Sequence, residues 1–99
     1  MSLNIEKQIA EQTVLKLEGR LDTVSAPSLE AELKKDINGV QTLIFDFAKL
    51  EYLSSAGLRV LLASQKVMNR QGEMRIRNVN STISDIFEIT GFSEILTVE

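Results

Sequence analysis

The sequence of 99 residues contains no cysteine, no histidine and no tryptophan, and it has a single proline. Without cysteine the chain can form no disulfide and offers no thiolate nucleophile. Without histidine it lacks the commonest general base at neutral pH and the commonest metal ligand. We therefore expect no catalytic residues, no metal site and no cofactor.

Long apolar runs and basic clusters are also missing. No apolar stretch approaches the roughly 18 residues of a membrane span. The 11 Lys and Arg residues are scattered among 14 Asp and Glu residues, giving a net charge of −3, so direct nucleic-acid binding is not expected. No secretory signal precedes the first predicted strand. These features favour a cytoplasmic protein without membrane insertion.

The hydrophobic content of 43% is enough for a real core, and the length suits one domain over residues 1–99. Apolar and polar residues alternate in Leu3–Ile9, and a second apolar segment follows at Thr13–Leu17. The connection between them is too short for a helix. The pattern therefore predicts an antiparallel hairpin at the start of the chain.

A first helix is predicted after a loop at residues 20–24. Ser25 is placed as its N-cap, and Pro27 falls in the first turn, where a missing N–H costs nothing. Val24 and Leu29 have the spacing of a hydrophobic staple. Asn38 and Gly39 are typical of the end of a helix.

The remaining segments alternate between strands and helices. Thr42–Phe47 is nearly all apolar, which is typical of a strand buried on both faces. A helix is predicted over Ala56–Gln71 and a strand over Glu73–Arg77. A third helix follows, with Asn80, Ser81 or Thr82 as its cap, and its buried stripe is Ile83, Ile86, Phe87 and Thr90. The last predicted element is a short strand at Ile95–Val98. The order ββαβαβα plus a short final strand predicts a single α/β domain with a mixed sheet and right-handed crossovers.

Two adjacent serines lie between the central strand and the second helix. Either Ser54 or Ser55 can cap the helix by accepting a hydrogen bond from an amide of its first turn. A hydroxyl at this point lies at the positive end of the helix dipole, where negative charge is favoured by about 0.3–1 kcal/mol. On the residues alone, capping is the simplest interpretation.

Asp46 allows two interpretations because it lies near the end of a buried strand. It could be an aspartyl phosphoacceptor of the receiver type. However, receiver domains begin with a βα repeat and an acidic pair, whereas this chain begins with a hairpin. A structural role, in which the carboxylate accepts amides of the following residues, is the preferred interpretation.

The whole stretch from Asp46 to Leu62 has the pattern D-F-x-x-L-x-Y-L-S-S-A-G-L-R-V-L-L. It resembles the STAS domain family, and in particular the anti-anti-sigma factors (anti-sigma factor antagonists). The segments Gly19-Arg20-Leu21-Asp22 and Ile89-Thr90-Gly91-Phe92 resemble two further motifs of that family. The resemblance covers almost the whole chain, and the STAS fold has the element order predicted above.

The resemblance implies a phosphorylation switch. In that family a serine at this helix start is phosphorylated by a partner, the anti-sigma factor serine kinase, and alignment on Gly57-Leu58 places the acceptor at Ser55. Many members carry Asp where this chain has Ser54. Unphosphorylated, the domain would bind the kinase and free a sigma factor.

The partner-binding residues implied by the resemblance surround this serine. They are Asp22, Thr23, Ser54, Ser55, Ala56, Gly57 and Arg59. Asp22 also suits loop capping, and Arg59 also suits a solvated helix position. The alternatives are a STAS accessory module of a transporter or of a stress-signalling assembly, not controlled by Ser55, and a binder of a small ligand. No oligomeric state is implied.

Overall fold

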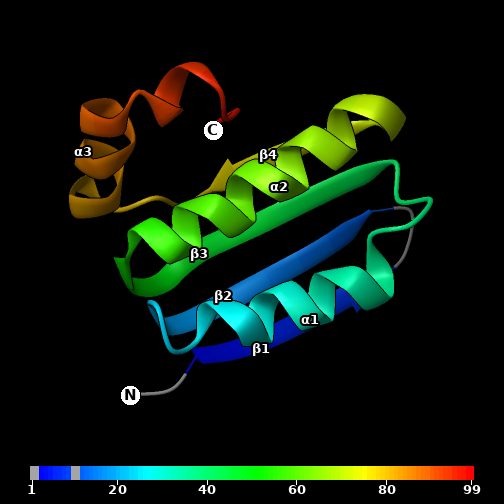
Figure 1. Ribbon diagram of the computed structural model, residues 1–99, viewed down its shortest axis with the longest axis horizontal. Coiled ribbons are helices and arrows are strands. Elements are labelled where there is room, and N and C mark those ends of the chain that lie inside the picture. The colour runs from blue at the N-terminus through cyan, green and yellow to red at the C-terminus, as the bar shows by residue number, and fades with distance from the viewer. Residues whose placement is uncertain (1–2, 10–11) are drawn as a thin grey trace.

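The structure, a computed structural model, describes residues 3–9 and 12–99. In chain order its elements are β1 (Leu3–Ile9), β2 (Thr13–Leu21), α1 (Ala26–Asp36), β3 (Thr42–Leu53), α2 (Ser55–Gln71), β4 (Glu73–Arg77), α3 (Ser81–Thr90) and a 3-10 turn at Phe92–Glu94. Helices α1 and α2 lie side by side over one face of the sheet, and α3 follows β4 at the left of the view (Figure 1).

Within the described residues, four strands form one sheet in the order β1-β2-β3-β4. Strand β1 pairs antiparallel with β2, from Leu3 opposite Gly19 to Ile9 opposite Thr13. The β2–β3 and β3–β4 pairs are parallel. The predicted hairpin, the mixed sheet and the order of elements are confirmed.

Two strands are longer than the sequence pattern predicts. The predicted loop at residues 20–24 is wrong at its start, because β2 continues to Leu21 and pairs there with Leu53 of β3. Strand β3 likewise continues six residues beyond Phe47. The β2–β3 register shifts twice, between Lys16 and Glu18 and between Gly19 and Arg20. These bulges break the regular alternation and so conceal the strand ends in the sequence.

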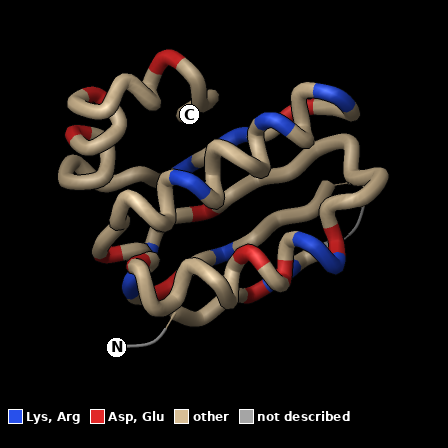
Figure 2. The backbone as a smooth tube through the Cα atoms, in the orientation of Figure 1, with Lys and Arg blue, Asp and Glu red and all other residues tan. Residues whose placement is uncertain are grey.

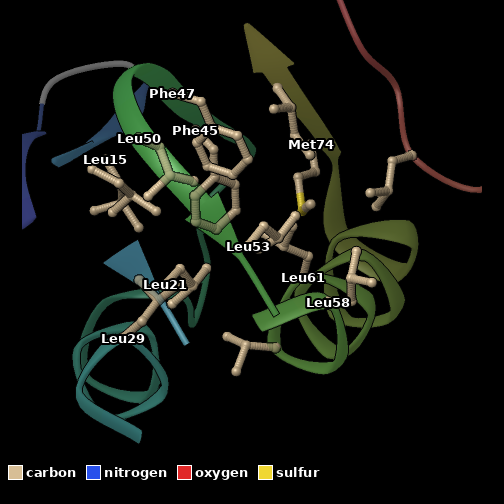
Figure 3. Close-up of a cluster of buried hydrophobic side chains, with 14 of the residues drawn as sticks. Leu15, Leu21, Leu29, Phe45, Phe47, Leu50, Leu53, Leu58, Leu61 and Met74 are labelled. Atoms are coloured by element: carbon tan, nitrogen blue, oxygen red, sulfur yellow. The ribbon is translucent and has the colours of Figure 1, made fainter. Parts of the chain in front are cut away.

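The core fills the space between the sheet and the two covering helices. Figure 3 shows leucines of β2, α1 and α2 around the two phenylalanines of β3. Phe45, Phe47, Leu21, Leu29 and Leu61 are fully buried. Burying each such side chain stabilises the fold by about 1.5–3 kcal/mol. These side chains hold α1 and α2 against β2 and β3, and the buried Ile83 and Phe87 join α3 to the same core.

The start of α1 differs from the prediction. Ser25 occupies the N-cap position, but its side chain caps no helix amide. The Val24–Leu29 staple is also wrong, because Val24 is 87% exposed while Leu29 is buried. Tight hydrogen bonding inside the preceding loop holds Ser25 in place and turns Val24 outward.

The C-terminal segment agrees with the prediction at the start of α3 and differs from it at Thr90 and at the final strand. Asn80 caps α3 by accepting a hydrogen bond from the Ile83 amide at 2.9 Å, and Gly91 ends the helix with a φ of 81°. Thr90 is exposed rather than buried, and its hydroxyl donates to the Ile86 carbonyl at 2.7 Å. The predicted strand at Ile95–Val98 is reduced to one bridge between Val98 and Ile76.

Candidate functional site

Ser54 and Ser55 lie where β3 passes directly into α2. Ser54 has an extended backbone, and its hydroxyl accepts a hydrogen bond from the Gly57 amide at 3.3 Å. Its own amide donates to the Leu21 carbonyl at 2.9 Å. Ser54 is thus the N-cap, which resolves the two possibilities left by the sequence. Ser55 is the first residue of α2 and is exposed.

Gly57 is buried beneath this turn. A Cβ atom at this position would lie 2.7 Å from Leu53 Cδ1 and 2.8 Å from Leu21 Cγ. Such approaches are too close for a side chain to fit without movement of the core. Gly57 therefore serves to seat the first turn of α2 against the ends of β2 and β3.

The loop after β2 is locked by Asp22 and Ser25. The Oδ1 atom of Asp22 accepts hydrogen bonds from the amides of Val24 at 3.1 Å and Ser25 at 3.0 Å. The Ser25 hydroxyl accepts from the Asp22 amide at 2.9 Å and donates to the Arg20 carbonyl at 2.7 Å. The Ser25 amide in particular lowers the pKa of Asp22, helped by its hydroxyl, the Val24 amide and nearby Arg20, and outweighs desolvation. Asp22 thus has the loop-capping role, and its carboxylate keeps its charge.

The hydrogen bond between Ser54 and Leu21 brings this loop next to the start of α2. Thr23 from the loop, with Ala56 and Arg59 from α2, line one hollow of about 210 Å³. Of these three side chains, Thr23 and Arg59 are exposed, and Ala56 is half-buried. The structure therefore gathers Thr23, Ala56 and Arg59 on one surface, with Asp22, Ser54 and Ser55 beside it in the same two segments.

Residues of α1 complete this hollow and were not anticipated from the sequence. They are Ala26, Pro27 and Glu30, together with Val60 of α2. These residues reach the hollow only because α1 and α2 pack side by side, and no local sequence motif specifies that packing. Helix α2 carries basic residues but no acidic ones, whereas α1 carries both kinds (Figure 2).

Comparison with known families is consistent with the sequence motif. The sequence profile described as the STAS domain matches residues 4–99. The chain belongs to the STAS domain family. No helix within residues 3–9 and 12–99 has the length and apolar character needed to cross a membrane.

Two curated relatives of this STAS domain carry the same functional name. BtrV of Bordetella bronchiseptica, named as an anti-sigma factor antagonist, is 35% identical over 100 residues, covering 99% of this chain and 85% of BtrV. The anti-sigma-B factor antagonist of Staphylococcus aureus is 30% identical over 103 residues, covering 99% of this chain and 94% of its own. Both relatives are thus named as antagonists of an anti-sigma factor.

Among solved structures, the fold resembles the anti-sigma factor antagonist SpoIIAA in two states. The unphosphorylated form has a TM-score of 0.75 at 22% identity, covering 98% of this chain and 86% of that one. The phosphorylated form, from Bacillus, has a TM-score of 0.74 at 22% identity, covering 98% and 90%. The STAS domain described here therefore resembles both forms of SpoIIAA to nearly the same degree.

Asp46 lies away from this surface. In β3 its neighbours Phe45 and Phe47 point toward the helices, so Asp46 points to the opposite face of the sheet. Its Oδ1 atom accepts from the Ala48 amide at 3.0 Å and from Asn78 Nδ2 at 2.9 Å. Desolvation raises the pKa of Asp46, but these hydrogen bonds and the charges of Arg77 and Lys16 outweigh it and hold the pKa below its ordinary value. The interactions support the structural interpretation of Asp46.

A second hollow of about 320 Å³ lies on that opposite face. Its lining carries both signs of charge, with Lys16 and Lys49 beside Asp46, Glu6 and Glu18. It is larger than the hollow beside Ser55, but it contains none of the partner-binding residues that the family resemblance implies.

Proposed function

We propose that this STAS domain is an anti-sigma factor antagonist whose binding to an anti-sigma serine kinase is switched off by phosphorylation of Ser55. The exposed position of Ser55 at the start of α2 is the observation that carries the proposal. The neighbouring Ser54 hydroxyl is engaged with the Gly57 amide, so Ser55 has the freer hydroxyl of the two. The names of BtrV and of the Staphylococcus aureus relative support the same function.

In the unphosphorylated state the domain binds the kinase through the surface around Ser55 and so frees a sigma factor. Thr23, Ala56 and Arg59 contact the partner, and the carboxylate of Asp22 lies at the edge of the contact. Gly57 is buried and contributes by setting the position of the first turn. The kinase supplies ATP and magnesium, and the domain supplies the acceptor hydroxyl.

In the phosphorylation step the Ser55 oxygen attacks the γ-phosphorus of ATP. The bond between the γ-phosphorus and its bridging oxygen breaks, ADP leaves, and the hydroxyl proton passes to a base of the kinase. The product carries about −1.5 to −2 charges near neutral pH. It lies at the N-terminus of α2, where the helix dipole favours anions, and one turn before Arg59.

Release of the kinase then needs no large rearrangement of the domain. The nearly equal likeness of this fold to the two forms of SpoIIAA is consistent with that. A phosphate placed inside a docked interface loses hydration and meets fixed groups of the partner, which costs several kcal/mol. Because each 1.4 kcal/mol changes affinity tenfold, a modest penalty releases the partner.

The test compares two variants of Ser55 with a matched change elsewhere. Ser55→Asp should keep the thermal midpoint nearly unchanged and weaken kinase binding at least about tenfold, as a charge buried in the interface requires. Ser55→Ala should bind and resist phosphorylation. Ser81→Asp is the control, because Ser81 is also an exposed first residue of a capped helix, and it should bind as the native chain does.

The measurement is isothermal titration with the anti-sigma kinases encoded in the genome that supplies this chain, followed by peptide mass spectrometry after incubation with ATP. Native binding by Ser55→Asp contradicts electrostatic release. Phosphate on Ser54 with Ser55 unmodified contradicts the choice of acceptor.

A further inference from the structure

A third hollow, with a mostly apolar lining, lies between α1 and α2 and continues the one beside Ser55. It has a volume of about 160 Å³, and its apolar lining is Leu33 and Ile37 of α1 with Val60, Ala63 and Val67 of α2. Glu30 and Val60 line both hollows. The two hollows are therefore parts of one groove, here called the α1–α2 groove, that runs along both helices from Thr23 and Ala56 to Ile37 and Val67.

The α2 side of the groove has an apolar stripe because of the helical spacing of its residues, while Glu30, Lys34 and Arg59 also line the groove. Ala56, Val60, Ala63 and Val67 follow each other at intervals of three or four positions, which places them on one stripe of α2. Val60 is buried at the floor, while Val67 is 36% exposed. Ser64 presents no free donor here, because its hydroxyl donates to the Val60 carbonyl at 2.9 Å.

We propose that the α1–α2 groove receives an amphipathic helix of the same anti-sigma kinase that recognises Ser55. The inference rests on the proposed function. The groove begins at Ala56, the residue after Ser55, so a partner docked on Ser55 already covers the end of the groove at Ala56. A partner helix that continues along the groove buries Ala63 and Val67, which are otherwise exposed.

The two helices that form the walls of the groove favour a helix as the occupant. Both walls are helices whose backbone groups are bonded within the helix, so an extended segment would find no main-chain partners there. A helix satisfies its own backbone and needs only an apolar stripe to fit the groove. The lining from Ala56 to Val67 spans roughly 16 Å at 1.5 Å per residue, which suits about three turns of a partner helix.

The test places a charge in the groove far from Ser55. Ala63→Glu introduces a long acidic side chain roughly 12 Å along α2 from Ser55, at 1.5 Å per residue. Ala31→Glu is the control, since Ala31 is an exposed alanine of α1 that does not line either hollow. Val67→Lys is the second groove variant, at a position already one-third exposed, and it covers the case in which Ala63→Glu fails to fold.

Kinase binding is measured by titration against the purified anti-sigma kinases of the same genome, with circular dichroism to verify folding. We expect Ala63→Glu and Val67→Lys to weaken binding at least about tenfold and Ala31→Glu to leave it unchanged. Native binding by both folded groove variants overturns the inference, while a loss of binding in Ser55→Asp would still support the proposed function.

Two further outcomes also decide against the groove assignment. If sedimentation shows that the native domain self-associates and the groove variants do not, with kinase binding unchanged, a second copy of the chain occupies the groove. If the native domain binds none of the kinases and Ser55 stays unmodified, the proposed function fails and the groove assignment fails with it.

Discussion

Ser54 and Ser55 are chemically identical, but the turn gives them different environments. The Ser54 side chain is half-buried and accepts a hydrogen bond from the Gly57 amide, and its backbone amide is bonded to Leu21. Ser55 begins α2 and faces outward. Although the two serines are adjacent, the Ser54 hydroxyl caps the helix and the Ser55 hydroxyl is accessible.

We expect Ser54→Ala to lower the free energy of unfolding by about 0.5–2 kcal/mol through loss of the helix cap. Phosphorylation at Ser55 should remain possible, because its exposure does not depend on the Ser54 hydroxyl. Urea denaturation and peptide mass spectrometry measure the two effects. Ser55→Ala is the matched control and should cost less stability. Equal stability of Ser54→Ala and the native chain would show that the 3.3 Å capping contact contributes little.

At the scale of elements, Gly57 sets how closely α2 approaches the sheet. Leu21 ends β2 and Leu53 ends β3, and the two residues pair with each other across the β2–β3 ladder. Helix α2 begins at Ser55, two residues after Leu53. Its first turn can pack closely against Leu21 and Leu53 because Gly57 has no side chain. Gly57 therefore sets the distance between the sheet and the first turn of α2, which carries Ser55.

Gly57→Ala should destabilise the domain by about 1–2 kcal/mol. Overpacking a core costs about 1–3 kcal/mol, and the better helix propensity of alanine returns up to about 1 kcal/mol. Urea denaturation at 25 °C measures the difference. A gain in stability would mean that Leu21 and Leu53 adjust freely, and the close packing inferred from the 2.7 Å and 2.8 Å approaches would then be wrong.

Edge strand β1 and helix α1 are joined by charge rather than by apolar contact alone. Lys7 Nζ lies 2.6 Å from Glu32 Oε2 and 2.6 Å from Asp36 Oδ2. The hydrogen bonds that Lys7 donates to Asp36 and Glu32 raise the pKa of Lys7. A charged residue on the helix side of an edge strand also discourages pairing with another chain.

For the whole molecule, three described carboxylates carry a lowered pKa: Asp22, Glu32 and Asp46. A carboxylate with a lowered folded-state pKa stabilises the protein above its unfolded pKa of about 4. That contribution is lost as the pH falls through the folded-state pKa. The free energy of unfolding should therefore decrease on acidification below about pH 4.

Asp46→Asn tests one part of this acid dependence. The variant should be less stable than the native chain near neutral pH, since it loses the ionised acceptor of the Ala48 and Asn78 hydrogen bonds. The difference should shrink as the pH falls from about 4, the unfolded-state pKa, through the lower folded-state pKa of Asp46, where the carboxylate becomes protonated. Denaturation curves across the pH range measure it. Asp85→Asn, at an exposed position of α3, is the control. A constant difference at every pH would contradict the charge-based account.

The sequence alone determined the order of elements, the hairpin and the location of the motif. Alternation in Leu3–Ile9 and the apolar stripe of α2 are local patterns with a period of two or about 3.6 residues, and such patterns persist in the folded chain. The cap of α3 was predicted to be Asn80, Ser81 or Thr82, because capping depends on nearby backbone groups, and the structure selects Asn80.

Tertiary structure decided the features that depend on distant partners. The last residues of β2 and β3 are strand because each pairs with the other, and Ser25 leaves its capping role because Asp22 and Arg20 hold its hydroxyl. The choice of Ser54 as the cap, the burial of Gly57 and the α1–α2 groove likewise depend on how α2 packs against β2, β3 and α1. A local sequence pattern carries no information on contacts between segments far apart in the chain, and for that reason these features emerged only in the folded protein.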